Sequence, residues 1–262
     1  MQKIGRKHMP NCRIMLGAAF IVTAQFAVPA GAATLTGKPT TVGKGTAQVI
    51  VETDSGGAPT SIAISMTEGA ITGVPTELNK NSPEGGYEYA LAMPEGVKSG
   101  YSEVMIDWNP KGHPPEHVYT VPHFDFHFYA IAPEAIEGIN FTGPDDPAIQ
   151  VSDKELLPPD YQVIPDTAVP MMGVHAIDMT APELHGKPFT ETFIYGYDKG
   201  KLIFLEPMVT QAFLETKPDA TTPVKTPAKY SEPGYYPTSY TVRFDATADR
   251  YLIQLGGLKA WK

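Results

Sequence analysis

Cysteine is almost absent from this chain, since Cys12 is the only one among 262 residues. A single thiol cannot form an intrachain disulfide, and it excludes a cysteine-rich zinc site as well. Basic residues are also few, with 20 Lys and Arg against 29 Asp and Glu, a formal net charge of -9. A nucleic-acid-binding surface needs an excess of positive charge to neutralise phosphates. The sequence therefore predicts no nucleic-acid partner.

Long apolar runs are missing except near the N-terminus. Residues 14–28 are apolar apart from Thr23 and Gln25, and they are followed by Pro29 and by a small-residue triplet that ends at Ala32. Four basic residues and no acidic residue lie within or just before this run: Lys3, Arg6, Lys7 and Arg13. Fifteen residues are too few to span the roughly 30 Å of a bilayer core as a helix. The pattern is typical of a signal peptide over residues 1–32, cleaved after about Ala32. It predicts a secreted or periplasmic protein without stable membrane insertion.

Removal of this segment changes the composition of the protein. The remaining residues 33–262 carry 16 basic and 29 acidic side chains, a net charge of -13, and no cysteine. Any tight transition-metal site in this part must therefore use His, Asp and Glu. Sequence motifs for serine hydrolases, for HExxH metalloproteases and for nucleotide-binding loops are also missing. No activity can be assigned from motifs.

Short β-rich runs separated by turns dominate residues 33–262. They predict a single, mainly β domain, an antiparallel sandwich or barrel, with one or two short helices at residues 133–138 and 207–215. Residues 153–172 are rich in proline and predict a loop. Residues 216–237 are Pro-rich too and predict an extended strap on the domain surface.

The six histidines of residues 33–262 all fall between positions 113 and 185. The densest part is the run PHFDFHFY at residues 122–129. Because side chains alternate along a strand, His123, Asp125 and His127 share one face. Phe124, Phe126 and Phe128 take the other, which predicts a core face. Three adjacent polar groups need water, a partner or a metal.

The spacing limits how these residues can share a metal ion. Alternate strand positions lie about 6.5–7 Å apart, so His123 and His127 are twice that distance apart on an ideal strand. Either Asp125 links them as a ligand or supporting partner, or a bulge brings them together.

Further ligands must come from elsewhere in the chain. His175 is the best candidate, followed by Glu206, which shares a predicted strand face with Leu202 and Phe204. His113, in a Pro-rich loop before the strand, completes the candidate set. The roles of Asp125, Asp178 and Glu191 stay open, and His117 and His185 are expected at the surface.

The predicted metal set is therefore His113, His123, His127, His175 and Glu206. Zinc is the expected divalent metal for such ligands, with iron, copper and manganese as alternatives. The competing interpretation is a polar strand face satisfied by water or hydrogen bonds.

Several blocks of the sequence resemble an uncharacterised family of secreted bacterial proteins. The blocks are residues 112–115 (GHPP), 122–129 (PHFDFHFY), 172–175 (MGVH), 193–196 (FIYG) and 206–208 (EPM). One Thermus member of that family is under extracytoplasmic sigma-factor control. The resemblance spans about residues 107–215 and implies a mostly β fold, self-assembly into a homo-oligomer, and His123, His127 and His175 as a shared set.

Two weaker likenesses fail at the spacing. Cupins and secreted carbonic anhydrases place His-x-His on a strand, whereas this chain has His-x-Asp-x-His at residues 123–127.

Three hypotheses of function follow. The first is a metal-binding protein without an assigned activity. The second is a metal-dependent enzyme of hydrolase or lyase type that activates water. The third is a structural, self-assembling envelope protein.

Overall fold

The computed structural model describes residues 31–82 and 85–262. The predicted signal peptide, apart from its last two residues, lies outside this part of the chain. The described residues form two seven-stranded antiparallel sheets and a two-stranded ribbon.

Sheet A is built from the N-terminal and C-terminal parts of the described chain, and sheet B from its middle. The strands of sheet A are β1 (Ala33–Thr36), β2 (Thr40–Val42), β3 (Gly45–Thr53), β4 (Pro59–Met66), β15 (Arg250–Gly256), β14 (Ser239–Asp245) and β12 (Asp219–Pro223). The strands of sheet B, in spatial order, are β5 (Tyr87–Leu91), β6 (Glu103–Asn109), β7 (His123–Tyr129), β11 (Lys201–Thr210), β10 (Glu191–Asp198), β9 (Gly173–Asp178) and β8 (Tyr161–Val169). The ribbon pairs β13 (Gly234–Tyr236) with β16 (Lys259–Trp261).

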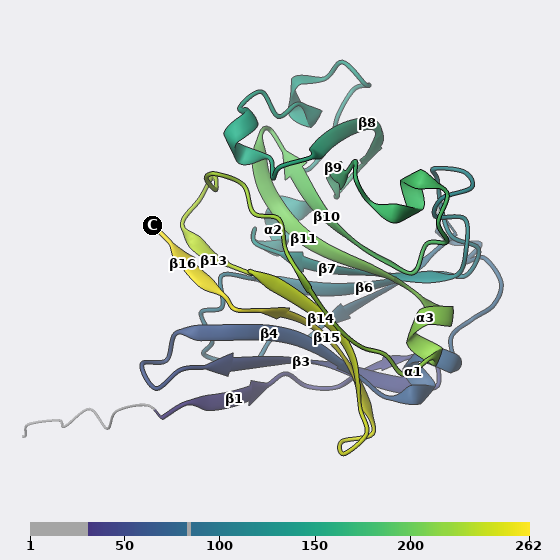
Figure 1. The fold of residues 1–262 in the computed structure, drawn as a ribbon, viewed down its shortest axis with the longest axis vertical. Helices are drawn as coiled ribbons and strands as arrows, with labels where there is room; N and C mark the ends of the chain where they lie inside the picture. The colour runs from purple at the N-terminus through teal and green to yellow at the C-terminus, as the bar shows by residue number, and fades with distance from the viewer. Residues whose placement is uncertain (1–30, 83–84) are drawn as a thin grey trace, which may run out of the picture.

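The main core lies between the two sheets. Val49, Ile64 and Ile253 of sheet A form one buried cluster with side chains of sheet B such as Phe126 and Tyr195. Figure 1 shows the two sheets one above the other, with the C-terminal ribbon beside them. Complete burial of a valine, isoleucine or phenylalanine side chain contributes about 1.5–3 kcal/mol to the free energy of folding. The predicted mainly β fold is confirmed, and the arrangement is that of an antiparallel sandwich rather than a closed barrel.

Helices are short in the described residues. They are α1 (Glu68–Thr72), α2 (Pro133–Ile136) and α3 (Gln211–Glu215), with 3-10 turns η1 (Pro147–Ile149), η2 (Lys154–Leu156) and η3 (Pro182–His185). The helix predicted at residues 207–215 begins only at Gln211. Pro207 and Met208 instead continue β11 by pairing with β10, and Thr210 caps the helix by accepting a hydrogen bond from the amide of Phe213. None of these helices is long and apolar enough to cross a membrane.

The loop predicted at residues 153–172 contains an unpredicted strand, β8. It pairs with β9 at the edge of sheet B, and its register shifts between Ile164 and Val169. Pro165 lies in this stretch, and proline is tolerated at an edge because one side of the strand needs no hydrogen-bond donor. The proline content that predicted a loop is therefore compatible with an edge strand.

The Pro-rich strap at residues 216–237 is anchored by lysines. Lys225 Nζ lies 2.8 Å from Asp178 Oδ2 and 3.0 Å from Asp160 Oδ2, and Lys229 Nζ lies 2.6 Å from Asp153 Oδ2. Part of the strap is regular, since it includes β12 and β13.

Candidate metal centre

Sheet B has two faces of different character. Phe124, Phe126 and Phe128 of β7 belong to the core shared with sheet A. The alternate residues His123, Asp125 and His127 take the opposite face, which we call the outer face, and all three are buried there. The alternation predicted from the sequence is therefore present, and the three polar residues are shielded from solvent.

The predicted ligands separate into two groups on this face. The His175 group contains His127, His175 and Glu206, whose nearest ligand atoms all lie within 4.8 Å of one another. The His113 group contains His113, His123 and Asp125 and meets the same limit. His123 and His127 thus belong to different groups, and β7 runs without a bulge between them in its pairing with β6. Asp125 contacts His123 but does not link it to His127.

The His175 group joins three strands of sheet B. His127 lies on β7, Glu206 on the neighbouring β11 and His175 on β9. His127 Nε2 is 3.6 Å from Glu206 Oε1, and His175 Nε2 is 3.9 Å from Glu206 Oε2. Both separations exceed the 2.7–3.2 Å or so of a hydrogen bond to nitrogen. Two histidines and a carboxylate thus converge on one point without bonding to one another.

An irregularity in β11 that the sequence does not reveal separates Leu202 from the face of Glu206. Gly196 pairs with Phe204 but Tyr197 pairs with Leu202, which leaves an extra residue in β11. Leu202 therefore packs in the core between the sheets, whereas Phe204 lies on the outer face. The interpretation that Leu202 shares a face with Glu206 is wrong, although Phe204 does share it.

All four histidines of the two groups are oriented through their Nδ1 atoms. The Nδ1 atoms of His113, His123 and His175 lie 2.6–2.7 Å from backbone carbonyl oxygens. A carbonyl oxygen can only accept, so each of these nitrogens donates its proton and Nε2 is turned toward the carboxylate of its group. His127 Nδ1 lies 3.0 Å from Asp107 Oδ2, although out of line for a hydrogen bond. Metal-binding histidines are held in this way by a carbonyl or carboxylate behind the ring.

Two supporting residues on β6 were not predicted. Asp107 lies directly across from Asp125 in the strand register, and Asn109 lies across from His123. Asn109 Nδ2 donates to Asp125 Oδ2 at 2.7 Å, and Asp107 contacts His127. Strand periodicity places both on the face opposite Trp108, but only the pairing of β6 with β7 brings them to the histidines.

Three carboxylates are buried close together on the outer face: Asp107, Asp125 and Glu206. Among the described residues, histidines are their only cationic partners within 4 Å. Two like charges directly opposite each other on neighbouring strands destabilise a sheet, as Asp107 and Asp125 do here. The arrangement therefore needs protons or a metal cation to balance its negative charge.

The pKa values of the metal-free groups show how protons supply that balance. Burial opposes the charged form of His113, but Asp125 raises its pKa to about 9. Burial likewise opposes the charged form of His127, but Glu206 and Asp107 raise its pKa to about 9. Burial raises the pKa of Glu206 to about 8, and it lowers the pKa of His175 to about 4. Burial would raise the pKa of Asp125, but His123 and His113 hold it well below the usual range.

These shifts predict how the stability of the metal-free protein depends on pH. His113 and His127 have folded pKa values of about 9, above the roughly 6.5 of an unfolded histidine. Their stabilisation is complete below about pH 6.5 and is lost as the pH rises through 9. The raised pKa of Glu206 acts in the same direction. The melting temperature of chelated protein is therefore expected to fall by several degrees between pH 6.5 and 9, and a rise across that window would contradict the assignment.

Apolar side chains enclose the polar groups on both sides. Tyr119, Phe189 and Met208 form one buried cluster, with the Phe189 ring centroid 5.5 Å from that of His123. Tyr129 and Phe204 belong to a second cluster, and the Phe204 ring lies 4.7 Å from the ring of His127. A low-dielectric surrounding strengthens the attraction between a cation and its carboxylate ligand.

Gly196 leaves space for the Phe204 ring. It lies between His175 on β9 and Phe204 on β11 in the strand register. A Cβ atom at this position would come within 2.2 Å of the Phe204 ring. The missing side chain therefore allows Phe204 to lie across β10 and against both histidines of the His175 group.

The other candidate residues lie outside both groups. Asp178 contacts Lys225 of the strap. Glu191 accepts a hydrogen bond at 3.3 Å from Thr222. Thr222 lies on β12, a strand of sheet A. His117 and His185 are exposed, as predicted.

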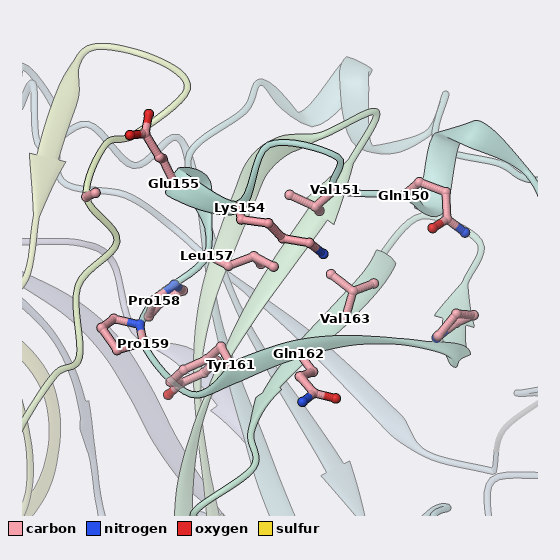
Figure 2. A pocket seen from close by; sticks show the side chains of 12 residues that line it. Gln150, Val151, Lys154, Glu155, Leu157, Pro158, Pro159, Tyr161, Gln162 and Val163 are labelled. Carbon is pink, nitrogen blue, oxygen red and sulfur yellow. The ribbon is translucent and has the colours of Figure 1, made fainter.

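A hollow of about 700 Å³ lies elsewhere, beside β8. Figure 2 shows Lys154, Tyr161 and Val163 among its lining residues. It contains none of the histidines or buried carboxylates of the two groups. The two candidate groups and this hollow are therefore separate features.

Comparison of the chain with protein-family models, with curated proteins and with solved structures gave no match. The site must accordingly be interpreted from its own geometry.

Proposed function

We propose that this chain is an exported metal-binding protein whose His175 group holds a divalent cation, with zinc as the expected metal. The observation that carries the proposal is the separation of the ligand atoms. Zn–N and Zn–O bonds of about 2.0–2.1 Å place neighbouring ligand atoms of a tetrahedron about 3.3–3.4 Å apart. The two contacts to Glu206, at 3.6 and 3.9 Å, are slightly wider than this and too long for direct hydrogen bonds.

The donor chemistry supports the same proposal. Neutral imidazole and carboxylate suit zinc, and two histidines with one carboxylate form a common ligand set for it. The Nδ1 contacts of His127 and His175 leave both Nε2 atoms directed toward Glu206. His127 Nε2 and Glu206 Oε2 are buried without a hydrogen-bond partner in the described structure, a costly state that a bound cation relieves.

Elemental analysis of the purified protein tests this proposal. We expect wild-type protein to retain stoichiometric divalent metal after gel filtration, and His175→Ala to lose the metal bound at this group because it removes one of three ligands. His185→Ala is the matched control, since His185 is exposed and its Nε2 contacts the Met179 carbonyl. Metal-free wild-type protein that also takes up no zinc on titration would refute the proposal.

A second candidate function is a metal-dependent enzyme of hydrolase or lyase type. The observation in its favour is that each group supplies three protein ligands, which leaves a fourth position for water, as in catalytic zinc sites. X-ray absorption of the loaded protein distinguishes the two: a solvent oxygen in the fourth position supports catalysis, whereas a fourth protein ligand supports a storage or structural role.

Export and self-assembly complete the proposal. The basic and apolar N-terminus of the sequence supports cleavage after about Ala32, and the resemblance over residues 107–215 supports a homo-oligomer. N-terminal sequencing of the exported protein and light scattering on a sizing column test these two points.

A further inference from the structure

We propose that His113, His123 and Asp125 bind a second divalent cation, so that each chain carries two. The inference rests in part on the proposed function, because its charge argument assumes one cation at the His175 group. Its residues are separate, however, so the two can fail independently.

A tight loop brings His113 to the strand. The loop leaves β6 after Asn109 and returns to β7 at His123. The amide of His113 donates to the carbonyl of Tyr119. Gly112 has a φ of +70°, and a Cβ there would lie 2.1 Å from that same carbonyl oxygen. Only a glycine permits this close approach, which places the His113 ring 4.7 Å from the His123 ring.

The ligand atoms of this group converge on Asp125. His113 Nε2 forms a 3.2 Å hydrogen bond with Asp125 Oδ2, which a bound metal would replace, and His123 Nε2 is 3.2 Å from Asp125 Oδ1. These distances are close to the roughly 3.3 Å edge of a zinc tetrahedron. His123 Nε2 and Asp125 Oδ1 are buried, and neither has a hydrogen-bond partner in the described residues. His123 Nε2 and Asp125 Oδ1 are thus two potential ligand atoms without a hydrogen bond, and His113 Nε2 belongs to the same group.

Hydrogen bonds to the histidine Nδ1 atoms and to Asp125 Oδ2 already orient these candidate ligands. His113 Nδ1 contacts the Pro114 carbonyl and His123 Nδ1 contacts the Val121 carbonyl, both at 2.7 Å. Asn109 Nδ2 holds Asp125 Oδ2 at 2.7 Å. A metal needs no rearrangement of these contacts, because each leaves its ligand atom directed into the group.

Charge also favours a second cation. With neutral histidines, Asp107, Asp125 and Glu206 carry three negative charges on one buried face. One divalent cation leaves one negative charge uncompensated, and a second gives a small positive excess that hydroxide or another monovalent anion balances. The competing way to neutralise Asp125 is a proton on His113, which the experiment below separates from a metal.

The two sites differ in access to solvent. The side chain of His113 is 30% exposed, whereas the most exposed side chain of the His175 group, that of His175, is 12% exposed. The cation of the His113 group is therefore expected to exchange faster than the cation of the His175 group, and its free coordination position is the one that solvent reaches.

Titration of chelated protein with Co²⁺, read by elemental analysis and calorimetry, tests the second site. We expect two ions per chain in the wild type and in His185→Ala, and one in His113→Ala and in His175→Ala. Loss of His113 is expected to weaken the metal affinity of the His113 group by more than about 100-fold. Asp125→Asn is the second variant, since an amide keeps the shape and the bond from Asn109 while removing the charge. Circular dichroism confirms that each variant is folded.

Each outcome is decisive. One ion in both the wild type and His113→Ala overturns the second site and leaves the His175 site standing. One ion in the wild type and none in either His113→Ala or His175→Ala means a single shared site, which also overturns the inference. No ion in the wild type refutes both proposals. Fast and slow phases of Co²⁺ release to a chelator, with the fast phase missing in His113→Ala, support the inference.

Discussion

Chelation is expected to lower the melting temperature of the protein by about 10 °C at neutral pH. A ligand present at about 1,000 times its Kd stabilises the folded state by about 4 kcal/mol. In a domain of this size each kcal/mol corresponds to about 2–4 °C. The effect arises because the ligands come together only in the folded chain, where the carboxylates of Asp125 and Glu206 are buried beside the histidines.

The matched variant takes one ligand from each group. In the His123→Ala, His127→Ala pair we expect the chelator to have no effect on the melting temperature, measured by differential scanning calorimetry. His185→Ala should keep the full shift. Identical melting curves of wild-type protein with and without chelator, together with no bound metal, would contradict a metal-binding function.

Phe126→Ala is expected to cost about 3–5 kcal/mol of folding free energy without removing the metal. Phe126 is fully buried in the core between the sheets, and truncating a core phenylalanine leaves a cavity. Its neighbours on β7, Asp125 and His127, point to the other face. Urea unfolding measures the loss, and elemental analysis in the cold, where the variant is folded, measures the metal.

Asp125→Asn is the companion to Phe126→Ala. It replaces one carboxylate oxygen of the adjacent residue by an amide nitrogen. We expect it to reduce the metal content and to lower the stability of the metal-free protein less than Phe126→Ala does. If the folded Phe126→Ala variant lost its metal, the separation of the two faces of β7 would be wrong.

Local patterning predicted much of this site. The alternation in residues 123–127 placed three polar side chains on one face, but both expected ways of joining His123 to His127, through Asp125 or through a bulge, are wrong. All five predicted ligands fall within the two groups. These features depend on the geometry of a single strand, which a sequence carries directly.

The rest depends on pairing between distant segments. Asp107 was missed because nothing in the local pattern tells which strand lies beside β7. The face of Leu202 was misjudged because an extra residue in β11 shifts the register. Strand β8 was missed because Pro165 is compatible with an edge position that local signals do not identify.

The His175 group also has a consequence for the order of events after synthesis. Its three residues lie 48 and 31 positions apart along the chain, at positions 127, 175 and 206, on strands β7, β9 and β11, which come together only in the finished sheet B. Such long loops must close before any cation finds all three donors. An unfolded chain offers only the local His-Asp-His run of β7, so capture of the proposed metal would belong to the last stage of folding. A protein exported in an unfolded state would accordingly take its metal from the compartment in which it folds.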